Sequence, residues 1–188
     1  MKSEIHHPVK SKLAQQALLL CLLTLVLIGC GFRLQGHTPL PFDTLLLSVP
    51  ENTAFGSDLR RAIIAASPRT RIVESSNEAY QAQFQQISET RTAREVSLNA
   101  QGRVEEYELT LTYSFRIISA NKDIILPATT LVVQRNMPFD DRVVQAKEGE
   151  QATLFKQMQK SLISRIMRQI SAPDVEARYA EIQSGASK

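Results

Sequence analysis

Residues 104–118 read VEEYELTLTYSFRII and contain the clearest pattern in the chain, a strict alternation of apolar and polar side chains. One side of this segment carries the apolar residues Tyr107, Leu109, Leu111, Tyr113, Phe115 and Ile117. The other side carries a polar row formed by Glu106, Glu108, Thr110, Thr112, Ser114 and Arg116. A period of two over this length predicts a long β-strand that buries one face and leaves the other in water.

The segments on either side of this strand are predicted to complete a sheet. Turn residues at 121–123 separate it from residues 124–135, which are rich in Ile, Leu, Thr and Val, so the two runs should form an antiparallel hairpin. Pro127 cannot donate a ladder hydrogen bond, which places the second strand at a sheet edge or puts a bulge there. Upstream, residues 80–98 alternate until Ile87 shifts the phase by one, which predicts a strand with a β-bulge.

The remaining periodic segments predict one more strand and two helices. Residues 42–49 form a short apolar run that ends at a proline, as a first strand would. Ser57 is the expected cap of a helix whose apolar residues recur at helical spacing before Pro68. Residues 151–171 predict a longer helix that stops before the next proline. Its apolar stripe consists of Phe155, Met158, Leu162, Ile166 and Ile170.

The order of these elements, β-α-β-β-β-α, predicts an α+β fold. Each helix has one apolar stripe and the sheet has one apolar face, so both helices should cover the same side of the sheet. The expected domain, residues 42–173, is therefore a two-layer sandwich with two helices packed on one face of a mainly antiparallel four-stranded sheet. Residues 174–188 lack a sustained apolar pattern and are predicted to be a flexible C-terminal tail.

Residues 1–29 follow the pattern of a cleaved signal peptide. Lys10 and Lys12 precede an apolar run at residues 17–28, and the small residue Gly29 comes next. The run is shorter than the roughly 20 residues that a membrane-spanning helix needs, and it lacks the polar stripe of a helix in a protein core. A signal peptide is therefore a better interpretation than either kind of helix.

The end of this signal predicts a lipid anchor at Cys30. Residues 27–30, Leu-Ile-Gly-Cys, match a bacterial lipobox, in which a peptidase cuts before the cysteine and the thiol accepts a diacylglycerol group. Cys21 leaves with the signal, so no disulfide is expected. Residues 30–41 contain glycines and prolines and are predicted to form a lipidated tether. Gly31 stands where aspartate would indicate retention in the inner membrane, which favours the outer membrane.

Charge and residue content argue against nucleic-acid binding and catalysis. The formal charge is +3, and the three lysines and one glutamate of the signal supply +2 of it, so the remaining +1 is not a nucleic-acid-binding balance. His37 is the single histidine after the signal, so no pair remains for a metal or a catalytic triad. Glu105 and Glu106 are strand neighbours that point to opposite faces. We predict a noncatalytic binding or assembly module without catalytic residues, metal or cofactor; an envelope enzyme would need a convergent cluster that the sequence lacks.

Positive charge suggests where such a module could bind. Arg91 and Arg94 precede a predicted turn, Arg103 follows it, and Lys147 lies beyond the hairpin. Arginine suits phosphate because its guanidinium donates two hydrogen bonds at once. The competing interpretation is an ordinary solvated surface, which the sequence alone favours.

Three stretches of the sequence resemble the LptE family of lipopolysaccharide-assembly lipoproteins of Gram-negative bacteria. They are residues 30–34 with the lipobox, residues 106–109 with the alternation that follows them, and residues 123–158, which lead from the hairpin into the helix. The resemblance implies that the chain plugs the lumen of the outer-membrane barrel LptD, assists its assembly and takes part in delivering lipopolysaccharide to the cell surface. It implies binding without turnover, by a protein that faces the periplasm or lies within the barrel lumen.

The resemblance also suggests which residues bind lipopolysaccharide. Lys147 matches a basic position of the family. In the turn at residues 100–103, relatives place an arginine slightly earlier, where this chain has Ala100, so Arg103 or Arg94 would have to substitute. The expected binding residues are therefore Lys147, Arg103 and Arg94. The alternative is a free-standing periplasm-facing lipoprotein that binds another envelope component and has no barrel partner.

Overall fold

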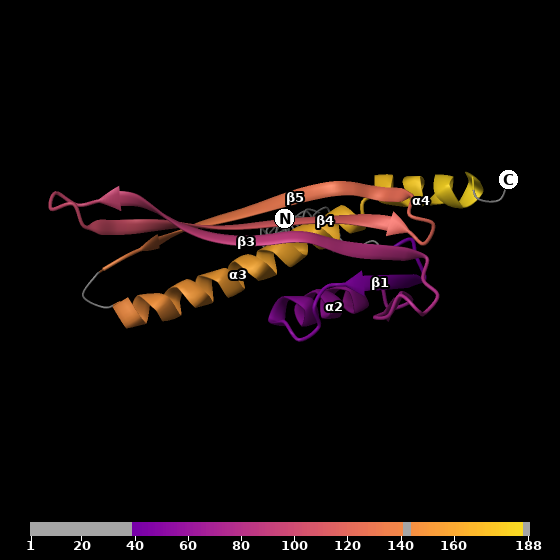
Figure 1. Cartoon of the computed structure of the whole chain (residues 1–188), viewed down its shortest axis with the longest axis horizontal. Helices are drawn as coiled ribbons and strands as arrows, with labels where there is room; N and C mark the ends of the chain where they lie inside the picture. Colours follow the sequence, from indigo (N-terminus) through magenta and orange to yellow (C-terminus); the bar gives the residue numbers. More distant parts are fainter. Residues whose placement is uncertain (1–38, 141–143, 186–188) are drawn as a thin grey trace, which may run out of the picture. The chain divides into compact units, whose positions relative to one another are not determined.

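The computed structural model describes residues 39–140 and 144–185, which form three helices and five strands (Figure 1). In chain order the elements are β1 (Thr44–Ser48), α2 (Ala54–Ala66), β2 (Arg71–Val73), β3 (Ala82–Leu98), β4 (Val104–Ser119), β5 (Ile124–Pro138), α3 (Val144–Ile170) and α4 (Pro173–Gly185). The predicted signal peptide, Cys30 and most of the predicted tether lie outside the described residues. The predicted α+β class is confirmed.

The five described strands form one mixed sheet with the order β2-β1-β3-β4-β5. β1 runs parallel to β2 and to β3, whereas β3, β4 and β5 pair in antiparallel order. The prediction of a mainly antiparallel four-stranded sheet is therefore wrong in two respects. It missed β2, whose three residues are too few to show a period, and it missed the parallel pairing of β1, which the connection through α2 makes possible.

The predicted bulge and edge position are both confirmed. The pairing of β3 with β4 shifts between Gln86 and Ser88, so Ile87 is the extra residue of a bulge. β5 lies at one edge of the sheet, where Pro127 is tolerated. The turn between β3 and β4 contains Gly102 at a φ of 75°, a left-handed conformation that glycine adopts without strain.

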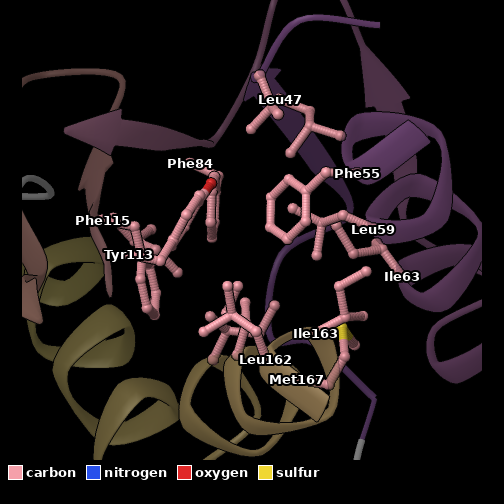
Figure 2. Close-up of a cluster of buried hydrophobic side chains, with 14 of the residues drawn as sticks. Leu47, Phe55, Leu59, Ile63, Phe84, Tyr113, Phe115, Leu162, Ile163 and Met167 are labelled. Atoms are coloured by element: carbon pink, nitrogen blue, oxygen red, sulfur yellow. The ribbon is translucent and has the colours of Figure 1, made fainter. Parts of the chain in front are cut away.

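Helices α2 and α3 cover the same face of the sheet, as predicted. Both lie on one side of the long strands in Figure 1, and their side chains meet those of the sheet in Figure 2. From α2 the core takes Phe55, Leu59 and Ile63, and from α3 it takes all five residues of the predicted stripe. On the sheet, the rings of Phe84 and Phe115 stack with 5.0 Å between their centroids. The two-layer packing of these helices on the sheet therefore follows the apolar patterns of the sequence.

Both helices begin earlier than the sequence analysis predicted. Thr53, rather than Ser57, caps α2, because its hydroxyl oxygen accepts a hydrogen bond from the backbone N–H of Gly56 at 3.0 Å. Ser57 instead donates to a carbonyl oxygen within the first turn. α3 begins at Val144 and not near Gln151, because the intervening polar side chains include good helix formers although they extend no apolar stripe.

The predicted flexible tail is wrong for most of its length, because residues 173–185 form α4. Val175 and Tyr179, four residues apart on this helix, are both buried. The ring of Tyr179 meets the ring of Phe42 edge-on, with 5.4 Å between the centroids. Two apolar anchors are enough to dock a short helix, but they are too few to give the sustained pattern that sequence analysis requires.

Candidate functional site

Arg94 lies on the open face of the sheet, which is the face that carries the polar row and is opposite to α2 and α3. In the register of the strands it stands across from Glu108. Its Nη2 atom is 3.0 Å from Oε1 of Glu108, and its side chain is 73% exposed. An ion pair at this exposure contributes little to stability, so the pair leaves Arg94 as a solvated surface residue.

Lys147 lies on the other side of the sheet, near the start of α3. Its Nζ atom is 2.7 Å from Oε2 of Glu150, and its side chain is only 18% exposed. It lines a cavity of about 280 Å³, named the Lys147 cavity, whose other lining residues are Ala93, Tyr107, Met137, Phe139, Glu148 and Gln151. The sequence predicts a binding role for Lys147 but for none of the other lining residues.

Much of the wall of the Lys147 cavity is apolar. The rings of Tyr107 and Phe139 meet edge-on with 5.1 Å between their centroids, and Met137 pairs with Tyr107 across the strands. A cavity with apolar walls and one partly buried ammonium suits an amphiphile, because the walls accept hydrocarbon while the ammonium donates to a phosphate. Phe139, the aromatic residue directly after β5, received no role from the sequence, because it lies beyond the alternating pattern that defined the strand faces.

Arg103 lies in the turn between β3 and β4. Asn99 organises this turn, because its Oδ1 atom accepts backbone hydrogen bonds at 3.0 and 2.9 Å, the second from the N–H of Arg103. Arg103 is four residues from Tyr107, a separation of about 13 Å along an extended strand. The β3–β4 turn, which contains Arg103, and the start of α3, which contains Lys147, lie at the same end of the sheet (Figure 1), whereas Arg94 is on the opposite face.

The described groups with shifted pKa values lie away from the Lys147 cavity. Burial raises the pKa of the Tyr113 hydroxyl, which donates to Oε1 of Gln86 at 3.4 Å in the core. A hydrogen bond with Glu74 raises the pKa of Glu51 at the surface. Within residues 39–140 and 144–185, no three His, Cys, Asp or Glu side chains gather closely enough to hold a metal ion. The helices in these ranges are too short or too polar to cross a membrane.

Solved structures of bacterial lipoproteins share this fold. The solution structure of the uncharacterized lipoprotein B from Nitrosomonas europaea matches with a TM-score of 0.62 and 34% identity, over 76% of this chain and 91% of that chain. Crystal structures of the rare lipoprotein B from Shewanella oneidensis and a minor lipoprotein from Acinetobacter baumannii match with TM-scores of 0.60 and 0.57. At 23% and 24% identity, over 71% of this chain and 98% and 94% of theirs, these two show the fold alone. The fold is thus one that small bacterial lipoproteins use.

Sequence comparison identifies the family within this class. A family model described as LptE, lipopolysaccharide-assembly, matches residues 42–170. The LPS-assembly lipoprotein LptE of Pectobacterium atrosepticum is 25% identical over 155 residues, which are 81% of this chain and 83% of that protein. The chain belongs to the LptE family, as the resemblance of its sequence indicated, and its role lies in lipopolysaccharide assembly.

Proposed function

We propose that the protein is a noncatalytic outer-membrane lipoprotein that plugs the LptD barrel, helps to assemble it and takes part in delivering lipopolysaccharide to the cell surface. The observation that carries the proposal is the family match over residues 42–170, which spans the sheet together with α2 and α3. A plug also needs a rigid body with a polar surface. The packing of α2 and α3 makes one face of the sheet rigid, and the open face supplies the polar surface that can contact the barrel.

The open face suits the polar lumen of a large outer-membrane barrel. Many of its side chains already have partners across the strands, namely Ser114 with Thr130 at 2.8 Å, Arg116 with Gln85 at 2.7 Å and Arg94 with Glu108 at 3.0 Å. Covering polar groups that keep such partners costs less free energy than covering unpaired ones. The barrel could therefore enclose this face with little loss of hydrogen bonding.

Co-purification tests the barrel partner directly. A tag placed after Lys188, beyond the end of α4, should recover the native protein from detergent extracts of its own envelope together with a large outer-membrane barrel in stoichiometric amount. Mass spectrometry identifies the companion, and heat-dependent migration in gels shows whether it is a folded barrel. Recovery of the lipoprotein alone would contradict the plug and favour the free-standing lipoprotein.

The proposal includes direct binding of lipopolysaccharide at the end of the sheet that carries Lys147 and Arg103. Lipopolysaccharide carries both phosphates and acyl chains, and the Lys147 cavity offers a cation beside apolar walls. Hydrogen bonds to charged groups contribute about 1.5–3 kcal/mol each. The double variant K147E/R103E should therefore weaken lipopolysaccharide binding at least tenfold, measured with the purified lipoprotein in a capture assay.

The matched control for this double variant is R61E/K160E, which makes the same change in net charge at exposed positions of α2 and α3. It should retain wild-type affinity. A separate R94E variant tests the opposite face of the sheet, which Arg94 occupies. Direct binding at the Lys147 cavity is rejected if K147E/R103E binds as well as the control, and loss in R94E alone would move the site to the open face.

A further inference from the structure

A second cavity, of about 300 Å³, lies where the start of α2, the middle of β3 and the middle of α3 meet. It is named the Gln159 cavity and is lined by Pro50, Thr53, Ala54, Phe55, Gln86, Glu89, Arg91, Ala152, Lys156 and Gln159. It shares no lining residue with the Lys147 cavity. The family resemblance gives it no role, and of the basic residues noted in the sequence only Arg91 is among its lining residues.

The side chain of Gln159 is the most informative feature of this cavity. Gln159 is only 8% exposed, and it lines the cavity wall among the buried residues of α3. Within the described parts of the chain, its amide has no hydrogen-bond partner. Among the described side chains, the fully buried polar atom without a partner is Oε1 of Gln83, so the amide of Gln159 still reaches the open space of the cavity. A ligand in the cavity would supply what the described residues do not.

The bulge at Ile87 brings additional polar groups to the same wall. Gln86 and Glu89 are three residues apart, so in a regular strand their side chains would point to opposite faces. The bulge lies between them, and both are therefore on the helix-covered face, where Gln86 pairs with Phe115 and Glu89 with Tyr113. Oε1 of Gln86 accepts the Tyr113 hydroxyl, which leaves its NH₂ group as the end free to donate.

The charged groups of the Gln159 cavity leave an excess of positive charge. Arg91 donates from Nε and Nη2 to the same oxygen of Glu89, at 2.9 and 2.6 Å, so this pair is internally neutral. The guanidinium carbon of Arg91 also lies 5.7 Å from the centroid of the Phe155 ring, which holds it against α3. Lys156 is the remaining charged residue of the wall, and no described carboxylate pairs with it.

The start of α2 adds positive potential of its own. Ala54 and Phe55, in the first turn of this 13-residue helix, line the cavity, and that turn contains no acidic side chain. The N-terminus of a helix carries partial positive charge and unpaired backbone N–H groups, which together favour anions. An anion is thus the kind of ligand favoured by the start of α2, by Lys156 and Arg91, and by the side-chain amides of Gln86 and Gln159.

We infer that the Gln159 cavity binds one phosphate-type anion, either inorganic phosphate or the phosphate of a lipid headgroup. Lys156 supplies the unpaired charge, and Gln159 donates from the buried wall. Arg91 is held in place by Glu89 and Phe155, and it lines the same cavity. This inference does not depend on the barrel or on the Lys147 cavity.

The inference is tested by titrating inorganic phosphate into the purified full chain in detergent. Calorimetry and the broadening of the phosphorus NMR signal measure the binding. We expect saturable binding of one phosphate, weakened roughly tenfold or more in K156Q, because a charge-assisted hydrogen bond is lost. K160Q, with the same charge change one turn further along α3 and outside the cavity, should bind as the wild type does. The K147E/R103E variant should also bind as the wild type does.

A Q159L variant separates ligand binding from folding. Leucine nearly keeps the volume of glutamine and removes an amide to which no described residue hydrogen-bonds, so the melting temperature should stay close to that of the wild type while phosphate affinity falls roughly tenfold. Competition by a soluble short-chain phosphatidic acid would identify a lipid headgroup as the ligand, and its failure to compete would identify free phosphate. Absence of saturable binding overturns the inference, as does equal binding by wild type, K156Q and Q159L.

Discussion

Replacing Cys30 by alanine is expected to abolish labelling of the protein with radioactive palmitate and to leave an unprocessed precursor. We expect the thiol of Cys30 to accept the diacylglycerol group, because residues 27–30 match a lipobox, and we expect the peptidase to need this cysteine directly after its cut. Labelling followed by gel electrophoresis measures both consequences at once. The labelled and unlabelled forms should differ completely, because the thiol of Cys30 is the predicted point at which the diacylglycerol group is attached.

The matched control is C21A, which removes the other cysteine of the chain. Cys21 lies within the predicted signal peptide and leaves with it, so labelling and processing should match the wild type. Mass spectrometry of the mature protein should find its amino terminus at residue 30, with acyl chains attached. Labelled C30A protein, or an unmodified terminus elsewhere, would remove the basis for the membrane location proposed for this chain.

The number of acyl chains decides how durable this attachment is. Each buried methylene contributes about 0.8 kcal/mol, and one acyl chain alone gives only marginal, reversible membrane binding. The three chains implied by the lipoprotein pattern would hold the protein on the membrane for long periods. A folded domain that is tethered in this way meets a barrel in the same membrane far more often than a protein free in the periplasm would.

The long strands were predictable because, in a half-buried strand, the polarity of each residue indicates whether its side chain lies on the buried face or on the exposed face. The alternation at residues 104–118 identified the buried face of β4, and the slipped phase at Ile87 identified the bulge in β3. β2 was not predictable in this way, since three residues show no period. α4 escaped detection because Val175 and Tyr179 dock it with only two buried side chains, and docking of this kind depends on partners such as Phe42.

The candidate site was predictable in part. The sequence identifies basic residues near the turn and the start of α3. Because side chains alternate between the two faces of a strand, Arg91 and Arg94, three residues apart, must lie on opposite faces. Which of the two faces the helices depends on the register after the bulge, and the structure assigns that side to Arg91. The walls of both cavities come from elements far apart in the sequence. These elements come together because the helices pack on the sheet, and no local sequence pattern predicts which residues then line a cavity.

Replacing Leu162 by alanine is expected to lower the free energy of unfolding by about 2–5 kcal/mol, because it removes a fully buried side chain and leaves a space that its neighbours cannot fill. Leu162 is 0% exposed and lies in the core between α3, α2 and the sheet (Figure 2). Urea unfolding followed by circular dichroism measures the change. A typical small domain has only about 5–15 kcal/mol of stability, so this loss is a large fraction of the total.

The control is L98A, the same chemical change at a position 57% exposed near the end of β3, which should alter stability by no more than about 0.5 kcal/mol. Equal effects of L162A and L98A would contradict the packing of α3 on the sheet. The consequence for function follows from the position of α3, which carries Lys147 near its start and Gln159 in its middle. If α3 packs less firmly on the sheet, both cavities lose part of their wall, so L162A should weaken binding of lipopolysaccharide at the Lys147 cavity and of phosphate at the Gln159 cavity. A substitution within one cavity, such as K156Q, should weaken only the ligand of that cavity.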